Sequence, residues 1–298
     1  MKNPMNKNLF SPTIAGYLFV VISALSFASN NAFAVIGYRG GSTPLSLLTF
    51  RSLFALIALT LIIKSIGAPI SLPTRQRNIA LGLGILNALL SLALMSSFAH
   101  APIGLAVLVF YLFPILTGVS ASALGQEKLT KSLIFGLIGC FIGLLLTIEI
   151  NLEKEVLFGL VLAGIAAFLM TAINLISARV LNTGNVWSVT LHIHISATIL
   201  LILITIITTD FSLPVTTSGW GGVWGAAIFY TVAITAYFAA IARIGAIRSG
   251  LVMNLEPVGS IVLGFVWLSQ ILTLRQLIGA AIVICTVSAL KWFEQSSK

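Results

Sequence analysis

Residues 250–272 read GLVMNLEPVGSIVLGFVWLSQIL, an apolar stretch that carries a single carboxylate, Glu256, directly before Pro257. About 20 apolar residues make a membrane-spanning helix, so Glu256 is expected about 12 Å inside one at 1.5 Å per residue. Because proline lacks a backbone donor and frees the carbonyl one turn earlier, near Met253, the helix is predicted to be interrupted beside its acidic group. Ionisable residues inside spans are candidates for function; the structural alternative is a carboxyl group that satisfies the broken backbone.

The whole chain has the composition of a membrane protein. Of its 298 residues, 58% are hydrophobic and 8% are charged, whereas soluble domains carry about 25% charged residues. The formal net charge of +9 would suggest a nucleic-acid partner in a soluble domain. Here the basic residues lie in short connections between apolar stretches, where they set orientation, so no nucleic acid is expected.

The residue types that support metal or covalent chemistry are sparse. Cys140 and Cys285 lie inside apolar stretches without ligand spacing. His192 and His194 are two residues apart and point to different sides of one helix, which is poor geometry for a shared metal, so hydrogen-bonded histidines are predicted. No phosphate loop, nucleophile elbow or dinucleotide fingerprint appears in a supporting context. No cofactor, metal or enzymatic activity is therefore predicted.

The apolar stretches predict an all-α polytopic membrane protein with ten transmembrane helices. The first begins near Ile14, and its Ser23, Ser26 and Asn30 follow i, i+3, i+7 spacing, with Asn31 beside them. A polar stripe of this kind must face protein or water rather than lipid. The other nine helices are expected at about residues 44–66, 79–98, 103–124, 133–148, 156–178, 189–208, 222–241, 250–269 and 274–292.

The two halves of the chain are related by a constant offset of 143 residues. Each half holds five spans, an odd number, so the second half is predicted to lie inverted relative to the first. The repeats are expected at residues 1–150 and 151–298, within one membrane domain. Matching residues are Gly16 and Gly159, Asn31 and Asn174, Gly82 and Gly225, Pro114 and Pro257, Leu129-Thr130 and Leu272-Thr273, and Gly136 and Gly279.

The distribution of Lys and Arg supports inverted repeats and predicts the orientation. With the N-terminus in the cytoplasm, 12 of the 16 basic residues fall on cytoplasmic segments, Arg39, Lys154 and Arg275 fall outside, and Arg51 lies within a span. Residues 64–77 carry three basic residues, whereas the corresponding connection at 209–219 carries none. Both termini are therefore predicted to be cytoplasmic, in a bacterial inner membrane.

Polar residues inside the spans predict a substrate site. Arg51 is the other intramembrane charge, about 8 Å from Glu256 along a ~30 Å hydrocarbon core. A long side chain or a bound zwitterion could bridge that gap; alternatively, Arg51 reaches outward to a phosphate or a helix C-terminus. Polar groups at matching positions of two repeats predict a shared central cavity, although each Asn alone could be interhelical glue. The candidate substrate-binding residues are Asn31, Arg51, Asn87, Tyr111, Asn174, Tyr230, Asn254 and Glu256.

Three elements carry a family resemblance: Leu255-Glu256-Pro257, Phe50-Arg51 and the Gly-x-Glu-x-Leu-Thr run at residues 125–130. Together with ten spans in two repeats, they resemble the EamA-type branch of the drug/metabolite transporter superfamily, over about residues 14–292. The second repeat departs from the pattern, because Gln270 stands where a Glu is usual before the Leu-Thr pair. The resemblance implies secondary transport of small organic solutes, often amino acids or related metabolites, and often outward.

The sequence thus predicts a secondary transporter that exports small organic metabolites by alternating access. Its expected partners are the lipid bilayer, a small-molecule substrate and, as a candidate coupling ion, the proton; the chain is expected to be a monomer or a weak homodimer. One alternative is an importer of a nucleoside- or cofactor-like metabolite. Another is an intramembrane enzyme or a lipid-handling protein, although an enzyme needs a nucleophile with its base, or a metal cluster, within reach.

Overall fold

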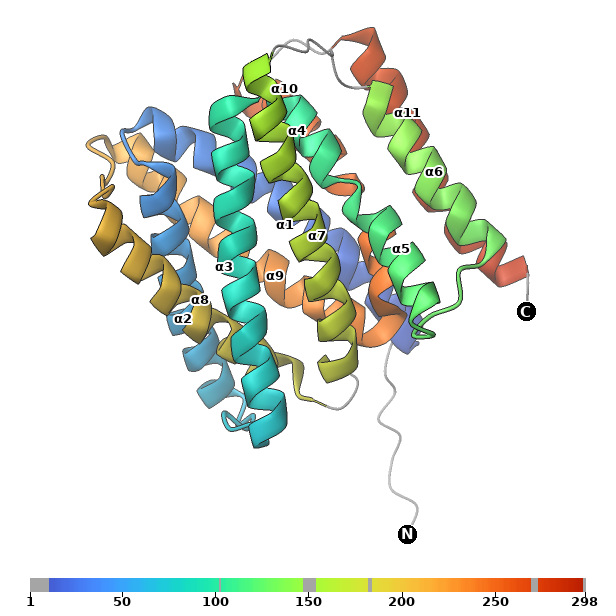
Figure 1. Ribbon diagram of the computed structural model, residues 1–298, viewed down its shortest axis with the longest axis horizontal. Coiled ribbons are helices and arrows are strands. Elements are labelled where there is room, and N and C mark those ends of the chain that lie inside the picture. The colour runs from blue at the N-terminus through green and yellow to red at the C-terminus, as the bar shows by residue number, and fades with distance from the viewer. Residues whose placement is uncertain (1–10, 102, 147–153, 182–183, 269–272, 297–298) are drawn as a thin grey trace.

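The computed structural model describes residues 11–101, 103–146, 154–181, 184–268 and 273–296, and within these ranges every regular element is a helix (Figure 1). Seven helical segments are long and apolar enough to cross a membrane, and three shorter apolar helices accompany them. This confirms an all-helical, multi-span membrane protein. The helices are α1 (Pro12–Arg39), α2 (Pro44–Ser65), α3 (Thr74–His100), α4 (Ile103–Phe110), α5 (Phe113–Ala123), α6 (Lys131–Leu146), α7 (Lys154–Leu181), α8 (Val186–Thr208), α9 (Thr217–Val252), α10 (Leu255–Leu268) and α11 (Leu274–Ser296).

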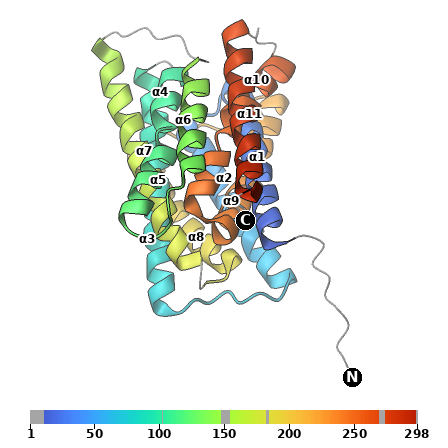
Figure 2. The ribbon, with the colours of Figure 1, turned by 90° about the vertical axis from the view of Figure 1, so that its right-hand side faces the viewer.

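The helices form one bundle whose two ends are distinguishable (Figures 1 and 2). At the end where α1 begins, which we call the terminal end, Gly16 lies against Ile244. At the opposite, far end, the connection from α1 to α2 pairs with the connection from α8 to α9. There the backbone N–H of Val215 donates to the carbonyl of Gly40 at 2.9 Å. Helices α6 and α11 lie side by side at one edge of the bundle.

Small residues allow the helices to approach closely where they cross. Helix α1 packs along α9, α3 along α7 and α8, α2 along α8, and α6 along α11. Gly139 and Gly143 of α6 lie against Thr286 and Val283 of α11. The spacing of these two glycines predicts such an approach, and the structure confirms it.

Hydroxyl groups join the helices inside the bundle. Ser52 and Thr198 link α2 to α8 with an oxygen-to-oxygen distance of 2.8 Å. On α1, Ser23 donates to the carbonyl of Ala233 in α9 at 2.8 Å, and Ser26 and Asn30 on the same face are also buried. The prediction that the polar stripe of α1 faces protein is therefore confirmed. In lipid, such hydrogen bonds supplement the packing of small side chains.

Two helices are interrupted near the middle of the bundle. The break between α4 and α5 falls just before Pro114, and the break between α9 and α10 falls at Met253 and Asn254, just before Pro257. A proline ring clashes with the carbonyl four residues earlier, which explains both positions. The Met253 carbonyl instead accepts the backbone N–H of Glu256 at 2.9 Å. The interruption predicted near Met253 is confirmed.

The predicted boundary between the eighth and ninth spans was wrong. A connection was expected at about residues 242–249, but the chain is helical on both sides of Gly245, which alone leaves helical geometry with φ 82° and ψ 172°. Glycine adopts positive φ at no steric cost, so the chain turns within one residue and needs no loop. The segment at residues 246–252 therefore forms the first half of the interrupted helix, and α10 forms the second.

Candidate functional site

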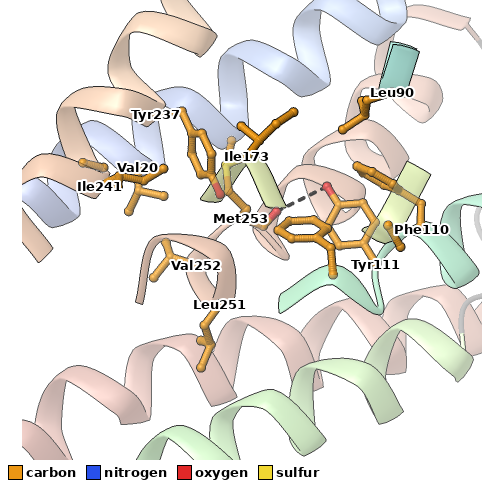
Figure 3. Close-up of a cluster of buried hydrophobic side chains, with 14 of the residues drawn as sticks. Val20, Leu90, Phe110, Tyr111, Ile173, Tyr237, Ile241, Leu251, Val252 and Met253 are labelled. Atoms are coloured by element: carbon orange, nitrogen blue, oxygen red, sulfur yellow. Dashed lines mark hydrogen bonds between the residues drawn. The ribbon is translucent and has the colours of Figure 1, made fainter. Parts of the chain in front are cut away.

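A cavity of about 170 Å³ lies among α1, α2, α3, α7, α9 and the two interrupted helices. Its α1 wall runs from Phe27, near the middle of the bundle, to Tyr38 at the far end. Toward the terminal end lie buried side chains, among them Val20 of α1 and Ile241 of α9, which are side by side (Figure 3). The cavity thus occupies the half of the bundle away from the terminal end.

The carboxylate of Glu256 enters this cavity from the first turn of α10. The proline-induced break places it there, because α10 starts anew at Leu255 in the middle of the bundle. Its Oε1 accepts a hydrogen bond from Nδ2 of Asn31 on α1 at 3.0 Å. Tyr111 and Arg51 are its other polar neighbours.

Arg51 of α2 lines the same cavity. Its guanidinium carbon lies 4.2 Å from the ring centroid of Tyr230, a cation–π contact. The Tyr230 hydroxyl accepts a hydrogen bond from Nδ2 of Asn87 at 3.2 Å. In the structure, aromatic and amide groups thus surround the Arg51 guanidinium inside the bundle.

Two amides separate the opposite charges. Nη1 of Arg51 lies 3.5 Å from the side-chain amide of Asn30, and the side-chain amides of Asn30 and Asn31 are 3.0 Å apart. All four residues, including Glu256, belong to the described part of the chain, and no direct ion pair joins Arg51 to Glu256 there. An amide both donates and accepts, so it can link the two charges without neutralising either. The cavity consequently offers a guanidinium group and a carboxyl group to a ligand.

Five of the eight predicted site residues line the cavity, and three lie behind its wall. Tyr111 donates to the carbonyl of Met253 with an oxygen-to-oxygen distance of 3.5 Å, across the break (Figure 3). Asn174 accepts from the Tyr237 hydroxyl at 2.8 Å. Asn254 donates to the Leu251 carbonyl at 2.7 Å, one turn earlier. None of the three is part of the cavity lining: Tyr111 and Asn254 bond to carbonyls at the break, Tyr111 also neighbours Glu256, and Asn174 supports the cavity residue Tyr237. The five predicted residues that line the cavity are Asn31, Arg51, Asn87, Tyr230 and Glu256.

Four polar residues of the cavity lining were missed as site candidates: Asn30, Tyr38, Ser91 and Tyr237. Asn30 was assigned only to the polar stripe of α1, yet it lies between Arg51 and Asn31. Tyr237 was not singled out, although it stands seven residues after Tyr230 and therefore on the same helix face. That spacing was the available signal.

The two histidines of α8 bond to the backbone of their own helix. Among the described residues, no three His, Cys, Asp or Glu side chains are grouped so that they could hold a metal ion. Nδ1 of His192 pairs with the carbonyl of Ser188 at 2.8 Å, and Nδ1 of His194 pairs with that of Thr190 at 2.9 Å. Both histidines are thus hydrogen-bonded within α8, as predicted.

Comparison with known proteins places this architecture in a family. The model of the EamA-like transporter family matches twice, at residues 14–149 and 157–290. The chain belongs to this family. The EamA-like chain is also 28% identical over 192 residues to the uncharacterized transporter YyaM of Bacillus subtilis (strain 168). That match covers 60% of this chain and 61% of the relative, so it spans less than two thirds of the relative's length.

A protein of known crystal structure shares the fold of this EamA-like chain. The superposition has a TM-score of 0.78 and covers 96% of this chain and 98% of the other. Sequence identity is 20%, so the likeness concerns the fold alone.

Proposed function

We propose that this EamA-like transporter carries small zwitterionic metabolites, amino acids or related compounds, out of a bacterial cell across the inner membrane. The supporting observation is the cavity, in which Arg51 and Glu256 face the same space without forming an ion pair. A ligand carboxylate pairs with the guanidinium, and a ligand ammonium group pairs with the carboxylate. Charged groups that are kept apart inside a membrane are costly, which favours a functional over a structural role.

The rest of the cavity favours an apolar or aromatic side chain on the ligand. Phe27, Leu90, Phe113, Met170 and Ile234 line it together with the polar groups. Small-molecule sites combine a largely apolar wall with a few placed polar groups that set orientation. A zwitterion with a bulky apolar substituent matches both parts of this wall.

The transport cycle that we propose is alternating access between two inverted five-helix repeats. The family model matches residues 14–149 and 157–290, which start 143 residues apart, the offset found in the sequence. Under this offset α1 corresponds to α7, α2 to α8, α3 to α9 and α6 to α11. The packing is reciprocal as well: α1 packs on α9 and α3 packs on α7, while α2 packs on α8 and α6 on α11. In the proposed orientation the far end is outside, so the cavity occupies the outer half and the buried side chains at the terminal end close the inner half.

A charge series at constant shape tests the substrate class. In proteoliposome counterflow assays, leucine should compete better than isopentylamine or 4-methylpentanoate, which keep the alkyl group but lose the carboxylate or the ammonium group. Each single-charge analogue leaves Arg51 or Glu256 without its partner in a partly buried site, where an unpaired charge is costly. Equal competition by all three compounds would contradict recognition of a zwitterion. Absence of counterflow for any amino acid would contradict the substrate class as a whole.

The orientation makes a separate prediction. In a Cys285→Ser background, an Asp210→Cys variant should react with a membrane-impermeant maleimide added to intact cells. A Thr74→Cys variant should react only after permeabilisation. Both positions are exposed, so the comparison reports sidedness rather than burial. The reverse pattern would overturn the orientation and the charge argument for inverted repeats.

A further inference from the structure

Glu127 lies at the terminal end, in the connection between α5 and α6, and does not line the cavity. Its Oε1 accepts hydrogen bonds from the backbone N–H of Ala246 at 2.6 Å and of Ile247 at 3.4 Å. These amides begin the helical segment that follows Gly245. The first amides of a helix have no partner within it, and a carboxylate there satisfies them and interacts favourably with the helix dipole.

Gly245 is required for this contact for two reasons. Its φ of 82° lies in the region that side-chain-bearing residues rarely adopt. A Cβ at this position would also lie 2.7 Å from the carboxylate carbon of Glu127. The carboxylate therefore reaches the helix start only because residue 245 has no side chain.

The capped segment leads directly to the candidate site. It runs through buried Ala246, Ile247, Leu251 and Val252 to the break at Met253 and Asn254, after which comes Glu256. Helix rise is about 1.5 Å per residue, so the seven residues at 246–252 extend about 10 Å from the capped end into the bundle. A shift of Ala246 along the helix axis would therefore shift the break by the same amount. We infer that Glu127 is a positioning residue, which caps the segment at residues 246–252 and thereby sets the depth of Glu256; the inference rests on the proposed transport function.

The second carboxylate oxygen of Glu127 makes the Gln substitution a conservative test of capping. Oε2 of Glu127 is buried and has no hydrogen-bond partner among the described residues. Glu127→Gln keeps one acceptor oxygen for the two amides, whereas Glu127→Ala keeps none. If capping is the role of this residue, Glu127→Gln should retain most of it and Glu127→Ala should lose it.

Hydrogen–deuterium exchange in lipid nanodiscs tests the cap without any substrate. Glu127→Ala should raise amide exchange at residues 246–256 by about tenfold or more, and Glu127→Gln should raise it by less. The matching interruption at residues 107–116, between α4 and α5, is the internal control and should not change. Unchanged exchange at residues 246–256, or an equal rise at both interruptions, would overturn the inference.

Transport then separates positioning from fold support. Glu127→Ala should lower counterflow several-fold in the wild-type background and cause no further loss in a Glu256→Gln background, because it acts through Glu256. Equal losses in both backgrounds would overturn the positioning role. If no solute is transported, the proposed function fails. The amide exchange at residues 246–256 then decides by itself whether Glu127 caps the segment at residues 246–252.

Discussion

Replacing Glu256 by Gln should reduce transport by about 10- to 100-fold while the protein remains folded and inserted. Glutamine keeps the shape and can still pair with Asn31, which now donates to Oε1 at 3.0 Å, but the negative charge is lost. A hydrogen bond to a charged partner contributes about 1.5–3 kcal/mol, which corresponds to this range. Counterflow and binding should be measured in vesicles with and without an imposed pH gradient.

The gradient distinguishes two roles for the carboxylate. Loss of only the gradient response would identify Glu256 as a proton-coupling group, whereas loss of binding as well would identify it as a substrate contact. Asp210→Asn is the matched control, because it also removes a carboxylate but from an exposed connection at the far end, and it should transport normally. Unchanged transport and binding in Glu256→Gln would mean that the carboxylate only supports the helix broken at Pro257.

Replacing Gly84 by Ala should destabilise or misassemble the bundle. Gly84 of α3 faces α8, and an added methyl group would overlap the backbone oxygen of Ile193 and the hydroxyl of Ser196, and would lie 2.9 Å from the Ile193 carbonyl carbon. Backbone atoms cannot rotate away, so the helices must separate, at a cost of about 1–3 kcal/mol or more. The yield of monodisperse protein and its thermal midpoint in detergent measure the effect.

A control for this substitution lies two residues earlier on the same helix. A Cβ built at Gly82 meets nothing within 4 Å. Gly82→Ala should therefore be tolerated or slightly stabilising, because Ala has the better helix propensity by about 1 kcal/mol. Equal losses for Gly82→Ala and Gly84→Ala would show that α3 needs glycine for a reason other than its contact with α8.

Much of the architecture was predictable from local sequence alone. A span needs about 20 apolar residues, and a proline inside one removes a backbone hydrogen bond wherever it occurs. The interruptions before Pro114 and Pro257 could therefore be placed within a few residues. The multi-span, all-helical architecture and the buried polar face of α1 follow from the same local rules.

Helix rotation was decided only by the tertiary structure. In a membrane both lipid and protein core are apolar, so the pattern of apolar residues along a helix hardly indicates which face is buried. This is why Asn174 and Asn254 could not be distinguished from Asn31, although only Asn31 of the three lines the cavity. Asn30, its chain neighbour, entered the site through its contact with Arg51, which depends on the packing of α1 against α2.

The role of Glu127 illustrates the same division. The sequence by itself determined the spans, their interruptions, the 143-residue repeat and the bias of basic residues, because each depends on local composition or on spacing along the chain. Only the tertiary structure decided which polar groups meet: Glu127 with the helix start after Gly245, and Asn31 with Glu256. Those contacts join residues more than 100 positions apart in the chain. Their geometry depends on how whole helices pack against one another through small residues, and local composition does not determine that packing.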